Sequence, residues 1–169
     1  MAFIKSGSNV VSFAEVSDVQ AADQRLFESN EGLTDLVVED ALFRSTQRIL
    51  TLIRATDWWR ELNTTKLANQ QYQTLADLPD VDPNKILARQ DDFTELCVYY
   101  ALWNYLLPKI ADFSKEDNAE RAKIGFNQEK YNFRFEELIN QGDWYDLLSL
   151  GVLTSAEKLP GHMSLRRVR

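Results

Sequence analysis

The side chains that most often carry out catalysis are scarce in this chain of 169 residues. Its one histidine, His162, lies in a Pro-Gly-His segment near the C-terminal end, whereas a catalytic imidazole needs a rigid setting that orients one ring nitrogen. Its one cysteine, Cys97, lies in an apolar helical run, where a buried inert thiol is far more common than a nucleophile. A single cysteine also excludes an internal disulfide and a cysteine-rich zinc site.

Carboxylates are the other residues that could do chemistry here. They form four clusters: Glu39 with Asp40, Asp91 with Asp92 and Glu95, Glu136 with Glu137, and Asp143 with Asp146. On amphipathic helices such clusters are usually solvated, and a metal-binding or general-acid role requires desolvation. The chain has no Glu-x-x-His motif for a di-iron bundle, and its 6 glycines form no phosphate-binding loop. We therefore expect no enzyme, with no catalytic residues, no metal site and no cofactor.

Tryptophan and tyrosine pairs are the more distinctive feature. Trp58 and Trp59 are adjacent, so on a regular element they cannot both face the same core. Either the two pack at a helix end, or one enters the core and the other anchors an interface. Trp144 and Tyr145, inside a DWYD segment, leave the same two alternatives open. With Trp103, these four residues are the candidate interface anchors.

The net charge is −7 and the sequence pI is about 4.8. An acidic protein gains no counterion-release affinity from nucleic acid, which disfavours ordinary DNA or RNA binding. The charge is compatible with lining a passage through which DNA slides. The longest apolar segment, residues 96–107, is shorter than the roughly 20 residues of a membrane helix. No secretory signal is visible, so we expect a protein that is cytosolic where it is made.

Hydrophobic periodicity predicts a mostly α-helical protein, because few glycines and prolines are available for the turns of a β-sandwich. The expected helices are residues 17–29, 34–57, 84–110 and 114–140. The polar stretch between residues 63 and 84 predicts a turn or a short strand. We expect a single-domain helical bundle of about four helices over residues 17–150, with an extended N-terminal arm at 1–16 and an extended C-terminal tail at 151–169.

The apolar positions predict which faces the helices bury. In the second helix one stripe is formed by Val38, Leu42, Ser45, Ile49 and Leu52. The third helix has two stripes: Phe93, Leu96, Cys97, Tyr100, Asn104 and Leu107, and then Tyr99, Leu102, Trp103 and Leu106. A helix that is apolar on two sides is usually central in a bundle; otherwise a neighbouring subunit covers one side. The fourth helix also has two faces, one with Ala119, Ala122, Phe126 and Phe133, the other with Ile124, Tyr131, Phe135 and Leu138.

A resemblance to a known family lies in three stretches and a tail, taken in order along the chain. The stretches are EDALFRSTQRILTLIRATDWWREL, DDFTELCVYYALWNYLLPKIADF and FNQEKYNFRFEELINQGDWYDLLS, and the tail closes in RRVR. Together they resemble the head-to-tail adaptor proteins of tailed bacteriophages, also called connector or head-completion proteins. The resemblance covers about residues 33–169. It rests on helix order, the Trp-Trp break, the aromatic third helix and the DWYD-to-arginine tail, not on a catalytic motif.

The resemblance implies a virion protein, made in the host cytoplasm and located in the neck at the head-to-tail interface. About 12 copies form a dodecameric homo-oligomer ring beneath the portal protein, and the ring extends the DNA channel towards the next neck or tail component. DNA passes through without sequence-specific binding, and no membrane is involved. The implied portal-docking tail runs from about Leu153. Its candidate docking residues are Leu165, Arg166, Arg167, Val168 and Arg169.

A second hypothesis from another class is a monomeric helical protein that binds and regulates a cytosolic partner. The two hypotheses differ in whether the surplus apolar faces close a ring. Each contact in such a ring needs on the order of 1,600 Å² of buried surface. The arginine-rich end suits an acidic partner surface, and a solvated basic terminus is its ordinary alternative.

Overall fold

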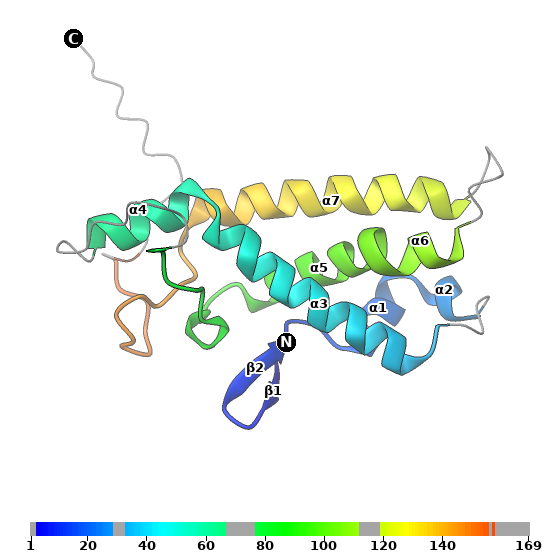
Figure 1. The fold of residues 1–169 in the computed structure, drawn as a ribbon, viewed down its shortest axis with the longest axis horizontal. Helices are drawn as coiled ribbons and strands as arrows, with labels where there is room; N and C mark the ends of the chain where they lie inside the picture. Colours follow the sequence, from blue (N-terminus) through cyan, green and yellow to red (C-terminus); the bar gives the residue numbers. More distant parts are fainter. Residues whose placement is uncertain (1–2, 29–32, 67–76, 112–118, 156, 158–169) are drawn as a thin grey trace, which may run out of the picture. The chain divides into compact units, whose positions relative to one another are not determined.

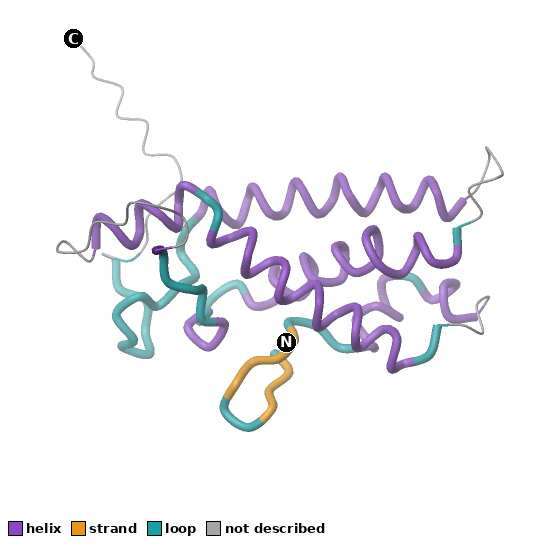
Figure 2. The backbone as a smooth tube through the Cα atoms, in the orientation of Figure 1, coloured by secondary structure: helices purple, strands orange, loops and turns teal. Residues whose placement is uncertain are grey.

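The computed structural model describes residues 3–28, 33–66, 77–111, 119–155 and 157. The chain is mostly α-helical, as its periodicity predicts, and adds a small two-stranded sheet (Figures 1 and 2). It divides into two compact units. Unit 1 is Met1–Ile49 with Arg89–Phe135, and unit 2 is Leu50–Ala88 with Glu136–Arg169. These bounds are not those of the predicted arm, bundle and tail.

The N-terminal segment forms a hairpin where the sequence predicts an extended arm. Strands β1 (Ile4–Ser6) and β2 (Asn9–Ser12) are antiparallel, with a register shift beside Ile4 (Figure 2). Gly7 has a φ of 64°, which a tight hairpin turn requires and which glycine adopts without a Cβ penalty. The strands lead into a packed cluster in which the rings of Phe3 and Phe13 lie 4.6 Å apart. The N-terminal segment therefore packs against other residues of the same chain.

Two short helices stand where one was predicted over residues 17–29. Helix α1 (Val16–Ala22) begins with a capping box in which the backbone N–H of Glu15 donates to the Asp18 carboxylate at 2.8 Å. Asp23 then interrupts the helix with an extended φ of −147°, and α2 (Gln24–Glu28) follows. Helix α1 begins one residue before the predicted start at residue 17, because the reciprocal bonds at Glu15 satisfy two backbone donors.

Helix α3 (Asp35–Arg54) follows its predicted pattern closely. Of the predicted stripe, Leu52 is half-buried and the other members, listed here, are fully buried: Val38, Leu42, Ser45 and Ile49. The Thr46 hydroxyl accepts the backbone N–H of Phe13 at 3.1 Å and lies 3.5 Å from the Cys97 sulfur. In unit 1, α3 therefore packs on the hairpin segment and on the helix that contains Cys97, α5 (Gln90–Ala101).

Helix α5 (Gln90–Ala101) is the centre of unit 1 and has buried residues on several sides. It begins later than the predicted start at residue 84, after Arg89 in a left-handed conformation. It continues through a π-helical turn, η3 (Leu102–Leu106), into α6 (Leu107–Ile110). Pro108 explains the π turn, because proline has no N–H to donate to the preceding turn and its ring clashes with that turn.

Helix α7 (Ala119–Gln141) lies alongside α5 in unit 1 (Figure 1). The rings of Tyr131 and Tyr100 are 5.0 Å apart, and Arg134 forms an ion pair with Glu95 at 3.1 Å. The helix ends at Gln141, one residue past the predicted end at residue 140. Gly142 follows with a φ of 56° and donates to the Leu138 carbonyl. The predicted start at residue 114 lies outside the described residues.

Unit 2 contains a helix that the sequence analysis did not predict, α4 (Asp57–Lys66). The Thr56 hydroxyl accepts the backbone N–H of Trp59 and so caps it. A 3-10 turn, η2 (Pro83–Lys85), is capped by Asp82, whose carboxylate accepts the backbone N–H of Asn84 at 2.9 Å. Ile86 then pairs with Tyr145 in an isolated antiparallel bridge. Residues 67–76, which make up about half of the stretch predicted to form a turn or a short strand, lie outside the described residues.

Among the described residues no helix is long and apolar enough to cross a membrane.

Candidate interaction surfaces

Four of the five predicted interface anchors form the aromatic core of unit 2. Trp58, Trp59, Trp144 and Tyr145 are between 0 and 4% exposed. Trp58 packs on Trp144 with ring centroids 4.6 Å apart, and Trp59 packs edge-on against Tyr145 at 4.9 Å. Adjacent tryptophans can both be buried because the DWYD segment supplies two successive rings, one for each indole. The structure therefore supports the packed-pair alternative for these residues and leaves them no exposed face for a partner.

The polar atoms of this aromatic core are hydrogen-bonded. The Trp59 indole N–H donates to the Pro79 carbonyl at 3.0 Å, and the Trp144 indole N–H donates to the Leu138 carbonyl at 2.9 Å. The Tyr145 hydroxyl accepts the backbone N–H of Asp82 at 3.3 Å. Burial raises the pKa of Tyr145 to about 12, so its proton stays in place near neutral pH. These bonds indicate a rigid structural cluster.

Trp103, the fifth predicted anchor, is half-buried in η3. Its ring lies 5.3 Å from that of Tyr100 and 6.4 Å from that of Tyr131. The Trp103 indole nitrogen and the Tyr131 hydroxyl are buried and have no hydrogen-bond partner within the described part of the chain. Trp103 thus keeps an accessible portion that the other four anchors lack.

Members of two of the predicted carboxylate clusters form ion pairs with arginines. Asp40 pairs with Arg44, Asp92 with Arg89 and Glu95 with Arg134. In the described ranges no group of three or more His, Cys, Asp or Glu residues could hold a metal ion. Burial raises the pKa of Cys97 to about 12, so its thiol is protonated and poorly nucleophilic.

Two buried carboxylates shape the loop after α7. Asp146 accepts the backbone N–H groups of Leu150 at 3.0 Å and Gly151 at 2.7 Å. Glu157 accepts the N–H of Leu148 at 2.9 Å, together with the N–H and hydroxyl of Thr154. These bonds satisfy the backbone donors of Leu148, Leu150, Gly151 and Thr154 in this segment. It ends shortly before the predicted docking residues.

The same loop exposes three aliphatic side chains. Leu148, Leu150 and Val152 are each at least half exposed. Apolar side chains grouped on a loop with a fixed backbone are a candidate contact surface. The predicted docking residues themselves lie outside the described residues: Leu165, Arg166, Arg167, Val168 and Arg169.

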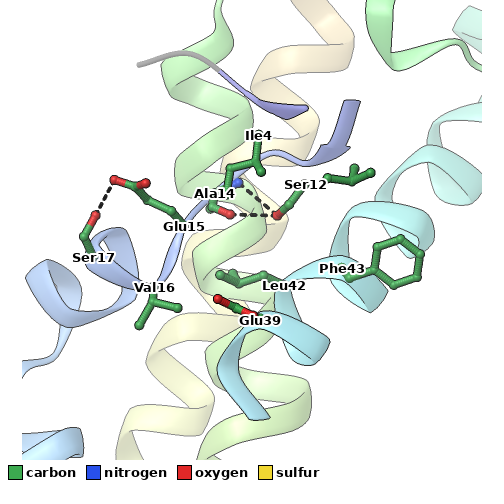
Figure 3. Close-up of a pocket in the computed structure, with 10 residues that line it drawn as sticks. Ile4, Ser12, Ala14, Glu15, Val16, Ser17, Glu39, Leu42 and Phe43 are labelled. Atoms are coloured by element: carbon green, nitrogen blue, oxygen red, sulfur yellow. Dashed lines mark hydrogen bonds between the residues drawn. The ribbon is translucent and has the colours of Figure 1, made fainter. Parts of the chain in front are cut away.

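In unit 1, α3 and the hairpin segment form an open cleft of about 520 Å³ (Figure 3). Its apolar lining includes Ile4 and Val11 from the strands and Leu42 and Phe43 from α3. Phe43 is 47% exposed at the cleft, and Leu36, one heptad earlier on the same helix, is 76% exposed. We call Leu36, Phe43 and this cleft the α3 face.

The outer side of α7 carries a second exposed aromatic surface. Phe126 is 57% exposed and Phe133 is 66% exposed. The Lys130 ammonium lies 5.5 Å from the centre of the Phe126 ring. We call Phe126, Lys130 and Phe133 the α7 face. Sequence periodicity grouped the two phenylalanines on one side, and the structure shows that the opposite side, with Tyr131 and Leu138, is the buried one.

Comparison of the chain with protein-family models, curated proteins and solved structures finds no match in any of the three.

Proposed function

We propose that this chain is a structural protein of a tailed-phage virion, a head-to-tail adaptor that forms a ring between the portal protein and the tail. The proposal starts from the sequence resemblance to that family. It implies a location in the virion neck, a role in extending the DNA channel, and no catalytic activity. Its partners are the portal protein, further copies of the chain and the next neck component.

The observation that carries the proposal is the presence of two unlike exposed apolar faces on unit 1. The α3 face and the α7 face belong to helices that contact α5 through different residues: α3 through Thr46 beside Cys97, and α7 through Tyr131 beside Tyr100. Large exposed apolar groups mark interaction surfaces. A subunit in a ring needs two such surfaces, because each copy contacts one neighbour with each.

The portal protein supplies a direct test. The purified full chain is mixed with portal rings and imaged by negative stain. We expect a collar on the portal ring that disappears when Leu165–Arg169 is removed, and that weakens when the three tail arginines become alanine. Replacing the same arginines by lysine is the charge-matched control and retains most of the binding. A monodisperse chain that never joins the portal contradicts the proposal and favours the monomeric regulator.

A further inference from the structure

The loop after α7 contains an uncharged stretch with exposed aliphatic side chains. Residues 147–155 include no Asp, Glu, Lys or Arg, in a chain of which charged residues make up 27%. Within this stretch Leu148, Leu150 and Val152 are 50, 57 and 63% exposed. We call residues 148–152 the aliphatic loop. Aliphatic side chains are unfavourable in water, so several of them exposed on one loop mark a contact surface.

The backbone of the aliphatic loop has an unfavourable conformation. Ser149 has a φ of 56° and Gly151 has a φ of 74°, so two left-handed residues alternate with the three exposed aliphatic ones. Serine is strained at such a φ, and the strain persists only where the surrounding contacts impose it. Strained residues are concentrated at binding and catalytic sites. The conformation of Ser149 therefore indicates that this loop does more than connect two segments.

Two buried carboxylates impose this conformation. Asp146 accepts the backbone N–H groups of Leu150 and Gly151, at 3.0 and 2.7 Å. Glu157 accepts the N–H of Leu148 at 2.9 Å. Both acids are almost completely buried, so these bonds are shielded from water. A loop whose backbone is already fixed loses less conformational entropy when it binds a partner.

The sequence that follows the aliphatic loop indicates the charge of that partner. Residues 158–169 contain no Asp or Glu, and they contain four basic residues: Lys158, Arg166, Arg167 and Arg169. An uncharged aliphatic surface followed by a cationic segment is complementary to an apolar groove bordered by carboxylates. The proposed function assigns the cationic segment to the portal protein, so the partner that lies beside the aliphatic loop is the portal protein too.

We therefore infer that the aliphatic loop is a second, rigid part of the portal contact, in which Leu148, Leu150 and Val152 enter an apolar groove of the portal protein. This inference rests on the proposed function. It adds a contact of fixed shape to a segment that is recognised by its charge. Apolar anchors at the centre of a contact contribute most of the affinity, whereas charges at its rim mainly steer the encounter.

Aspartate substitutions test the apolar contact. Leu150→Asp and Val152→Asp are made separately in the full chain, and the Kd is measured on immobilised portal rings of the same phage. We expect each to raise the Kd by about tenfold or more, because a carboxylate is poorly solvated in an apolar groove. Leu87→Asp, at another exposed leucine of unit 2, is the control and keeps the parent Kd. Circular dichroism spectra that match the parent chain exclude misfolding.

Two substitutions of Ser149 test whether the shape of the loop matters. Glycine adopts the left-handed φ without strain, so we expect Ser149→Gly to keep the parent Kd. Valine resists that φ because it is β-branched, so we expect Ser149→Val to raise the Kd by about threefold or more. Both variants leave the aliphatic side chains and the cationic segment unchanged. An equal Kd for the two would overturn the inferred role of the fixed backbone.

The outcomes separate this contact from the adaptor function. Portal binding that is unchanged in both Leu150→Asp and Val152→Asp overturns the inference and leaves the adaptor function to the cationic segment alone. A parent chain that never binds portal rings overturns both. Loss of the self-assembled species of Leu150→Asp in native mass spectra, without portal protein, means that copies of the chain meet at this loop, and this overturns the inference as well.

Discussion

Asp146 and Glu157 are buried carboxylates that accept hydrogen bonds from the backbone of one loop. Burial of Glu157 by itself raises its pKa, but the bonds from the Thr154 hydroxyl and from the N–H groups of Leu148 and Thr154 outweigh it, so the pKa lies below its ordinary value. The charged form is therefore the one that the fold needs. At the scale of the residue, these acids position Leu148, Leu150 and Val152.

A carboxylate with a lowered pKa makes the loop sensitive to acid. In the unfolded chain the Glu157 carboxylate has its ordinary, higher pKa and binds a proton more tightly than in the folded chain. The contribution of Glu157 to the stability of the loop is therefore fully present above about pH 4.3, and it is lost as the pH falls through the lower pKa of the folded chain. We expect amide-exchange protection at Leu148 and Thr154 to fall in that acid range. Glu157→Gln reproduces the loss at neutral pH, because one acceptor oxygen becomes an N–H₂ donor. Protection unchanged by both treatments contradicts this role; exposed Glu136→Gln is the control.

The indole nitrogens of Trp144 and Trp103 differ in their hydrogen bonds. Trp144→Phe removes one of two donors to the Leu138 carbonyl, which still accepts the Gly142 N–H, so the lost hydrogen bond costs about 0.5–1.5 kcal/mol in the free energy of unfolding. Trp103→Phe removes a nitrogen that has no partner in the described part of the chain, so we expect a smaller loss. Urea unfolding measures both. An equal loss would show that the Trp144 hydrogen bond contributes little.

At the scale of the element, glycine has opposite roles within α7. Gly142 ends the helix with a φ of 56°, and Gly142→Ala costs about 1 kcal/mol because alanine is strained there. Gly125 lies inside the helix, and a Cβ added there meets nothing within 4 Å. Gly125→Ala therefore stabilises the chain by about 1 kcal/mol. Thermal unfolding of the pair checks both signs, and the same sign for both variants would contradict the helix bounds.

The elements that the sequence predicted well are those set by local pattern. The buried stripe from Val38 to Ile49 and the end of α7 near residue 140 each depend on residues a few positions apart. The late start of α5 was missed because residues 86–88 lie against the DWYD segment, where Leu87 donates to the Trp144 carbonyl. Local periodicity does not contain such a distant pairing. The Thr56 cap of α4 is a local signal too, but it lies inside the helix that periodicity predicts over residues 34–57.

For the candidate surfaces too, local pattern predicts some features, and contacts between distant residues decide the others. Periodicity grouped Phe126 with Phe133 correctly but could not say which side of α7 is buried, because both sides carry aromatic rings. Contact between Tyr131 and Tyr100 of α5 decides it. The sequence leaves open whether Trp58, Trp59 and Trp144 lie at an interface or in a core. Their ring contacts with each other and with Tyr145 place them in the core of unit 2.

At the scale of the whole molecule, the central claim is that copies of this chain join through unlike surfaces into a ring. The most direct measurement is native mass spectrometry of the purified full chain over a range of concentrations, with negative-stain images of the same samples. We expect a closed species of about 12 copies, seen as rings, that is lost in Phe43→Glu and in Phe126→Glu but kept in Leu87→Glu, a change at an exposed leucine that belongs to neither face. A chain that stays monomeric at every concentration, alone and with portal protein, would contradict the claim.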